Sequence, residues 1–119
     1  MKLYLITRQD LPPGVQAAQL VHAMRQFSED HPEVDRDWFE NSNTIVLLAA
    51  SNEGSLGVVA DRARCRGIPV ACFREPDRDN ELTAIALGPE GKSLTRKLPL
   101  ALSWSSSSPY SESPPLSPS

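Results

Sequence analysis

The sequence of 119 residues lacks several features that mark particular classes of protein. It has only two cysteines, which excludes a disulfide framework and favours a reducing compartment. Lysine and arginine total 12 against 15 acidic residues, so the basic excess typical of nucleic-acid-binding proteins is missing. No apolar run approaches the roughly 20 residues that span a bilayer, and the first residues do not resemble a signal peptide. We therefore expect a cytoplasmic protein without membrane contact.

The composition divides the chain into two parts. Residues 103–119 contain 9 serines and 4 prolines among 17 residues, which is too little apolar surface to offset the entropy of ordering them. We expect a disordered, Ser/Pro-rich tail there. Residues 1–102 contain all 6 glycines and are close to the usual size of one domain.

Hydrophobic patterns in residues 1–102 predict about four strands and three or four helices. We expect strands over 2–8, 44–50, 69–73 and 82–87, and helices over 15–29, 32–41 and 90–98, with a further helix from an N-cap at Ser51 to Gly67. The uniformly apolar run 44–50 is typical of a strand covered on both faces, and the unit over 44–73 predicts a right-handed parallel crossover. The alternation of elements favours a three-layer α/β/α fold with a mixed sheet.

The helix over 15–29 is the most informative segment. Its apolar stripe is expected to consist of Ala17, Leu20, Val21, Met24 and Phe27, with Gln19, His22 and Gln26 on the opposite face. Histidine is the side chain best suited to act as a base near neutral pH, and an amide three residues earlier could orient a water molecule. An ordinary surface histidine explains the same pattern.

Acidic side chains supply a second candidate group. The loop over 75–81 contains Glu75 and Asp77 between two strands, at a sheet end where α/β sites form. A carboxylate there, or Asp10 at the end of the first strand, could polarise His22. A solvated loop and an Asx turn are the alternatives.

Three segments resemble the archaeal and eukaryotic type (type 2) of peptidyl-tRNA hydrolase. They are Arg8-x-Asp10-Leu11, Gly14-x-x-Ala17-Ala18-Gln19-x-x-His22-Ala23 and Thr83-Ala84-Ile85-Ala86-Leu87-Gly88-Pro89. The resemblance covers roughly residues 2–100. It implies a mixed four-stranded sheet between helices, frequent homodimers, and hydrolysis of the ester between a peptide and the 3′ ribose of tRNA, without a cofactor. The spacings of the two histidines and of the two cysteines match no zinc motif, so we expect no metal.

The resemblance also implies roles for individual residues. His22 would be a catalytic base or water-orienting residue with Gln19 as its neighbour, and Asp10 would be a site carboxylate. Thr83 matches a threonine of the final strand, and Glu75 replaces an aspartate of the late loop. Expected substrate contacts are Arg8, Asp77, Arg62 and Arg66, of which the last two share a helix face that could contact phosphates.

Two positions depart from the pattern of the family. Val15 stands where a lysine is usual, and residues 75–79 replace an Asp-Ala-Gly-x-Thr stretch in a loop about four residues shorter. These departures indicate a divergent, bacterial-like or phage-like branch. Three hypotheses follow: an esterase acting on peptidyl-tRNA, a non-catalytic binding or dimerising module on the same fold, and a hydrolase of another small ester.

Overall fold

The computed structural model of the protein describes residues 1–102, and the tail predicted over residues 103–119 lies outside the described residues. Two 3-10 helices, Pro76–Arg78 and Pro89–Gly91, follow the last two strands. The other elements are β1 (Lys2–Arg8), α1 (Pro13–Asp30), α2 (Pro32–Asn41), β2 (Thr44–Ala50), α3 (Glu53–Cys65), β3 (Val70–Glu75), β4 (Glu81–Leu87) and α4 (Lys92–Thr95).

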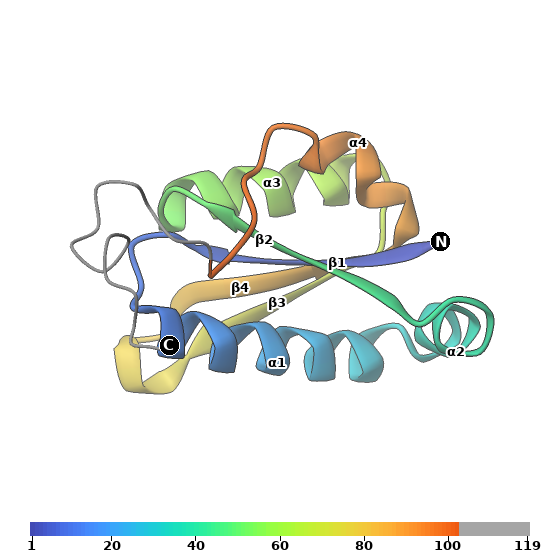
Figure 1. Ribbon diagram of the computed structural model, residues 1–119, viewed down its shortest axis with the longest axis horizontal. Helices are drawn as coiled ribbons and strands as arrows, with labels where there is room; N and C mark the ends of the chain where they lie inside the picture. The colour runs from blue at the N-terminus through green and yellow to red at the C-terminus, as the bar shows by residue number, and fades with distance from the viewer. Residues whose placement is uncertain (103–119) are drawn as a thin grey trace, which may run out of the picture.

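The four strands form one mixed sheet in the order β2-β1-β4-β3. β1 is parallel to β2 and antiparallel to β4, and β3 is antiparallel to β4. Figure 1 shows α3 and α4 on one face of the sheet and α1 on the other, with α2 beyond the end of α1. The predicted three-layer α/β/α fold is confirmed. The strands β2 and β3 are parallel, but they lie at opposite edges of the sheet.

The central strands β1 and β4 are buried along almost their whole length because helices cover both faces. Side chains alternate between the faces of a strand. Leu5 accordingly packs in the core with Phe27 of α1, whereas Ile6 packs in the core with Leu56 of α3. Each fully buried side chain of this size stabilises the fold by about 1.5–3 kcal/mol.

Several predicted bounds are confirmed. The ranges of α2 and β2 are those expected from the sequence. The helix α3 ends at Cys65, and Gly67 follows with a φ of +69°. That left-handed conformation carries no steric penalty for glycine, which is why the helix stops there.

The prediction for the buried face of α1 is wrong. Ala17 is exposed and Val21 is 59 % exposed, although both were expected in the apolar stripe. The buried residues are Gln16, Gln19, Leu20, Ala23 and Phe27. The helix can bury its two glutamines because their amides find hydrogen-bond partners beneath it, which removes the cost of burying a polar group.

Three further predictions are corrected. β2 is an edge strand and is not covered on both faces, since Ile45 and Leu47 are 42 % and 36 % exposed. The N-cap of α3 is Asn52 and not Ser51, because the Asn52 side chain accepts a backbone N–H of the first turn. The last helix covers only Lys92–Thr95.

Within residues 1–102, no helix combines the length and apolarity needed to cross a membrane.

Candidate active site

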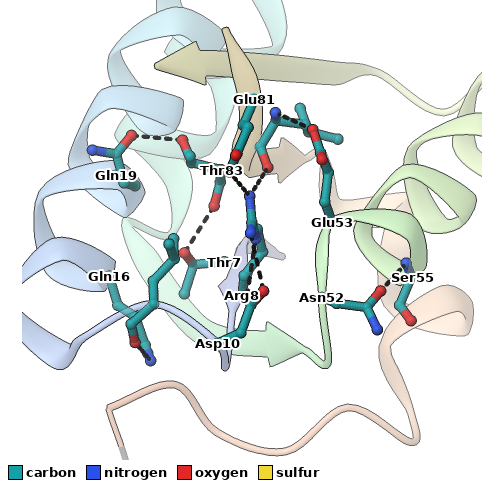
Figure 2. A network of polar contacts seen from close by, with 12 residues as sticks. Thr7, Arg8, Asp10, Gln16, Gln19, Asn52, Glu53, Ser55, Glu81 and Thr83 are labelled. Carbon is teal, nitrogen blue, oxygen red and sulfur yellow. Dashed lines mark hydrogen bonds and ion pairs between the residues drawn. The ribbon is translucent and has the colours of Figure 1, made fainter. Parts of the chain in front are cut away.

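The candidate site lies at the end of the sheet where β1 and β3 finish and β4 begins (Figure 2). The helix α1 starts at this end, directly after the loop that follows β1. Pro13 occupies its first turn, where the missing N–H of proline costs no helical hydrogen bond. Three segments that are distant in sequence therefore meet at one place.

A β-bulge in β4 determines where Thr83 points. Ala84 lies opposite Phe73 of β3, but the next residue of β3, Arg74, lies opposite Leu82. Thr83 is thus the extra residue of the ladder. Regular alternation would turn Thr83 away from Ala84 and toward α3. The bulge interrupts that alternation and directs the Thr83 hydroxyl toward α1, as bulges next to functional sites often do.

Thr83, Gln19 and Glu75 are joined by side-chain hydrogen bonds. The Thr83 hydroxyl donates to Gln19 Oε1 at 2.6 Å, and Gln19 Nε2 donates to Glu75 Oε1 at 2.8 Å. Because a carboxylate can only accept, the second bond fixes the orientation of the amide. Gln19 is 4 % exposed, so water competes little for these bonds. We call this group the Thr83–Gln19–Glu75 chain (Figure 2 shows its first bond).

Glu75 is the charged end of this chain. The hydrogen bond from Gln19 lowers the pKa of the Glu75 carboxyl, and the backbone N–H of Asp77 lowers it further. The nearby positive charge of Arg78 acts in the same direction. Glu75 is therefore a carboxylate at neutral pH.

The imidazole of His22 lies close enough for its positive charge to lower the pKa of the Glu75 carboxyl further. It stacks on the ring of Phe73, with ring centroids 4.6 Å apart and planes inclined by 18°. Phe73 and Glu75 are two residues apart in β3 and share one face, while Gln19 and His22 are one helical turn apart. The helix thus places Gln19 at Glu75 and His22 at Phe73. His22 is exposed, so its ring is open to a substrate.

A second group of side chains is centred on Arg8. Its Nε and Nη2 donate to the two carboxylate oxygens of Asp10, each at 3.0 Å, and its Nη1 donates to Glu81 at 2.8 Å. The hydrogen bond from Arg8 lowers the pKa of Asp10, and the hydrogen bond to Asp10 raises the pKa of Arg8. Arg8 and Asp10 are therefore both charged at neutral pH. We call Arg8, Asp10 and Glu81 the Arg8 cluster (Figure 2).

The two groups lie on opposite faces of the sheet because Thr7 and Arg8 are consecutive in β1. The Thr7 hydroxyl donates to the carbonyl of Thr83 at 2.8 Å. The backbone pairing of β1 with β4 ends at Thr7 and Ala84. At Leu82, side chains take over the hydrogen bonds that a neighbouring strand would otherwise make. Arg8 Nη1 donates to the Leu82 carbonyl at 3.1 Å, and the Leu82 N–H donates to Glu53 of α3 at 2.8 Å.

The structure therefore brings together four of the predicted catalytic residues and places Asp10 in a separate cluster. The four are Gln19, His22, Glu75 and Thr83. Among the predicted substrate contacts, Arg8 is engaged by acidic partners, and Asp77 is exposed in the 3-10 helix after β3. Arg62 on α3 and Arg66 at its C-cap are exposed and lie outside both groups. In the part of the chain that the structure describes, no three His, Cys, Asp or Glu side chains gather in a way that could hold a metal ion.

Sequence reasoning missed three residues of this region. Thr7 has a signal that could have found it, because it is a polar residue inside an otherwise apolar strand. Glu53 and Arg78 have none, since their contacts depend on how α3 and the 3-10 helix pack. Arg78 lowers the pKa of Asp10, although less than the hydrogen bond from Arg8 does.

The Thr83–Gln19–Glu75 chain and His22 form one group on the α1 face of the sheet. This group has the chemistry of a hydrolytic site. An exposed imidazole can exchange a proton near neutral pH, and a neighbouring carboxylate can stabilise its protonated form. The buried amide and hydroxyl hold that carboxylate in one orientation. The three-layer fold and this site define a small α/β protein with side chains suited to activating water.

Comparisons with known proteins agree with this class and narrow it to one family. The sequence profile of the family described as "Peptidyl-tRNA hydrolase PTH2" matches residues 1–103, so the chain belongs to that family. A peptidyl-tRNA hydrolase of Haloquadratum walsbyi is 32 % identical over 97 residues, which is 76 % of this chain and 87 % of that protein. A peptidyl-tRNA hydrolase of Thermococcus onnurineus is 28 % identical over 107 residues, which is 82 % of this chain and 91 % of that protein.

Proposed function

We propose that this chain hydrolyses the ester bond between the peptide and the ribose of peptidyl-tRNA, in the cytoplasm and in the service of translation. Membership of the peptidyl-tRNA hydrolase family supports this reaction. The observation that carries the proposal is the Thr83–Gln19–Glu75 chain, which ends beside the exposed ring of His22. It joins three segments of the chain into one ordered polar site.

In the proposed mechanism a water molecule binds between His22 and Glu75. The imidazole takes a proton from this water as the water oxygen attacks the ester carbonyl carbon. The ionised Glu75 stabilises the imidazolium that forms. The bond from the carbonyl carbon to the ribose oxygen then breaks, and the imidazolium returns the proton to that oxygen. The products are a peptide with a free carboxyl group and a tRNA with a free ribose hydroxyl.

The other predicted residues have supporting roles in this proposal. Gln19 and Thr83 are positioning residues, since they hold the carboxylate and do not themselves exchange a proton. Arg8 and Asp10 support the ends of β1 and β4 from the other face of the sheet, and the exposed Asp77 contacts the peptide part of the substrate and not its phosphates.

The reaction is tested with an N-acetylated aminoacyl-tRNA. We expect the wild-type protein to release the N-acetylated amino acid and His22→Ala to reduce the rate by about 100-fold. Gln26→Ala is the matched control, because Gln26 lies on the same helix and its amide donates to Asp30 in an exposed pair. Absence of release at high enzyme concentration would overturn the proposal. Tight tRNA binding without release would then favour the binding module, and release only from a small ester would favour the third hypothesis.

We also propose that the protein is a homodimer. A groove of about 350 Å³ runs between α1 and β2, and its lining is almost entirely apolar. Val21 and Ile45, which line it, are 59 % and 42 % exposed. Exposed apolar patches of this kind are typical of protein interfaces. Light scattering after size exclusion should give twice the chain mass, and Val21→Glu should give a monomer. A monomeric wild-type protein would contradict this proposal.

A further inference from the structure

A second groove lies between α3 and the segment that follows α4. Its volume is about 350 Å³, and its floor includes Ala50 at the end of β2. Two cationic side chains, Arg62 and Lys97, face it from opposite walls, and the serines Ser51 and Ser55 line it as well. Among residues 1–102, no acidic side chain lines this groove. It is a hollow with positive charge and hydroxyl donors in a protein whose net charge is −3.

The two cations of the groove have no acidic partner in the structure of residues 1–102. Neither Arg62 nor Lys97 takes part in an ion pair there. By contrast, the neighbouring Arg64 of α3 forms an ion pair with Asp61 at 3.0 Å. Two unneutralised like charges around one hollow repel each other, and an anion bound between them relieves that repulsion.

The groove lies at the same end of the sheet as the candidate active site, on the α3 face beside the Arg8 cluster. Ala50 lies directly opposite Arg8 in the parallel pairing of β1 and β2, and its carbonyl accepts the N–H of Gln9 at 2.8 Å. The strands are about 4.8 Å apart, so the floor of the groove is one strand away from the Arg8 cluster. Arg62 lies seven residues after Ser55, which is about 10 Å along the axis of α3. The groove thus leads from the end of the sheet along α3.

The opposite rim of the site has the reverse charge. The segment from the end of β3 to the start of β4 contains the carboxylates of Glu75, Asp77, Asp79 and Glu81 and one cation, Arg78. Arg8 neutralises Glu81, and the negative charge that remains repels a polyanion. A substrate that carries phosphates is therefore expected to reach the site from the side of α3.

We propose that the groove between α3 and residues 97–99 binds the phosphodiester backbone of the tRNA and so directs the ester bond to the active site. This inference rests on the proposed function. Arg62 and Lys97 contact phosphate oxygens, and the hydroxyls of Ser51 and Ser55 donate hydrogen bonds to them. The groove offers no side chain arranged to read a base, so binding is independent of tRNA sequence.

Charge reversal in the full-length protein tests the groove. The variants are Arg62→Glu and Lys97→Glu, and the matched control is Arg36→Glu, which reverses an exposed charge on α2 that pairs weakly with Glu40 at 3.5 Å. The first measurement is the Kd for deacylated tRNA at several salt concentrations. We expect each groove variant to raise Kd by about tenfold and to lower the slope of log Kd against log salt by about one unit. The control should match the wild type.

The second measurement compares N-acetylated aminoacyl-tRNA with the same N-acetylated amino acid esterified to adenosine, which has no phosphodiester backbone. The groove variants should raise KM for the tRNA ester by about tenfold at unchanged kcat, and leave the adenosine ester unaffected. Groove variants with the same tRNA Kd as Arg36→Glu overturn the proposal. If the wild type hydrolyses neither ester, the proposed function fails, whereas a salt-dependent loss of tRNA binding in the groove variants still supports the groove.

Discussion

Two groups of polar side chains meet at one end of the sheet, and they are built differently. The Thr83–Gln19–Glu75 chain lies on the α1 face, is linked through a neutral amide and hydroxyl, and ends beside the exposed ring of His22. In the Arg8 cluster on the α3 face, Nε, Nη1 and Nη2 of the guanidinium and both oxygens of Asp10 already have partners.

The difference separates a site from a support. To bind a ligand, the Arg8 cluster has to break its own hydrogen bonds. This is costly because Arg8 is 7 % exposed. The group on the α1 face has an exposed imidazole, His22, and a carboxylate, Glu75, whose orientation Gln19 fixes. We infer that the α1 face performs the chemistry and that the α3 face fixes the ends of β1 and β4. The following variants test this division.

The largest effect is expected for Gln19→Ala. This change removes the middle of the chain, so the Thr83 hydroxyl and the Glu75 carboxylate each lose their side-chain partner. We expect kcat to fall by about 100-fold for N-acetylated aminoacyl-tRNA. Gln26→Ala, which removes an exposed amide from the same helix, should leave kcat within about twofold of the wild type. Equal kcat values for the two variants would contradict a role for the chain.

Arg8→Met is expected to act on stability. It leaves Asp10 and Glu81 without their shared cation and Leu82 without a donor for its carbonyl. Because both carboxylates remain partly exposed, we expect a loss of about 2 kcal/mol in the free energy of unfolding. Urea denaturation measures it. The kcat of the folded protein should change by less than about fivefold, and a loss as large as that of Gln19→Ala would reassign the Arg8 cluster to catalysis.

Glu53→Ala tests how α3 supports the bulge. Its carboxylate accepts the N–H of Leu82, the residue before Thr83. We expect kcat to fall by about tenfold, because an unpaired N–H lets the bulge shift. Glu53→Gln keeps an acceptor oxygen and should recover most of the rate. Glu33→Ala, which removes an acid from the first turn of α2, is the control, and a similar loss there would exclude a specific role for Glu53.

The smallest effects are shifts in titration, and they distinguish the faces most cleanly. Hydrogen bonds from Gln19 and from Arg8 lower the pKa values of Glu75 and Asp10, respectively. Both carboxylates therefore stabilise the fold at neutral pH, and this contribution is lost as pH falls below about 4, through the lowered values. In a carboxyl NMR titration, Gln19→Leu should raise the pKa of Glu75 alone. Arg8→Met should raise that of Asp10 alone, and a joint shift in either variant would contradict two separate groups.

The sequence was sufficient for much of the fold but for only part of the site. Strong local patterns locate the strands and most of the helices, and the terminal glycine of α3 is predicted from its special conformation. The burial of Gln19 was not predictable, because its cost is offset by partners on β3 and β4 that are more than 50 residues away. The bulge at Thr83 was missed for the same reason, since a change of register between strands leaves no periodic trace in β4 itself.

The hydroxyl of Thr83 is the most direct test of the site. Thr83→Val replaces that hydroxyl by a methyl group of similar size, and Thr83→Ser keeps it. Single-turnover hydrolysis of N-acetylated aminoacyl-tRNA, at saturating enzyme, measures the chemical step for both. We predict that Thr83→Ser stays within about threefold of the wild type and that Thr83→Val is slower by at least about tenfold. Equal rates for the serine and valine variants would contradict the claim that the bulge positions Thr83 for catalysis.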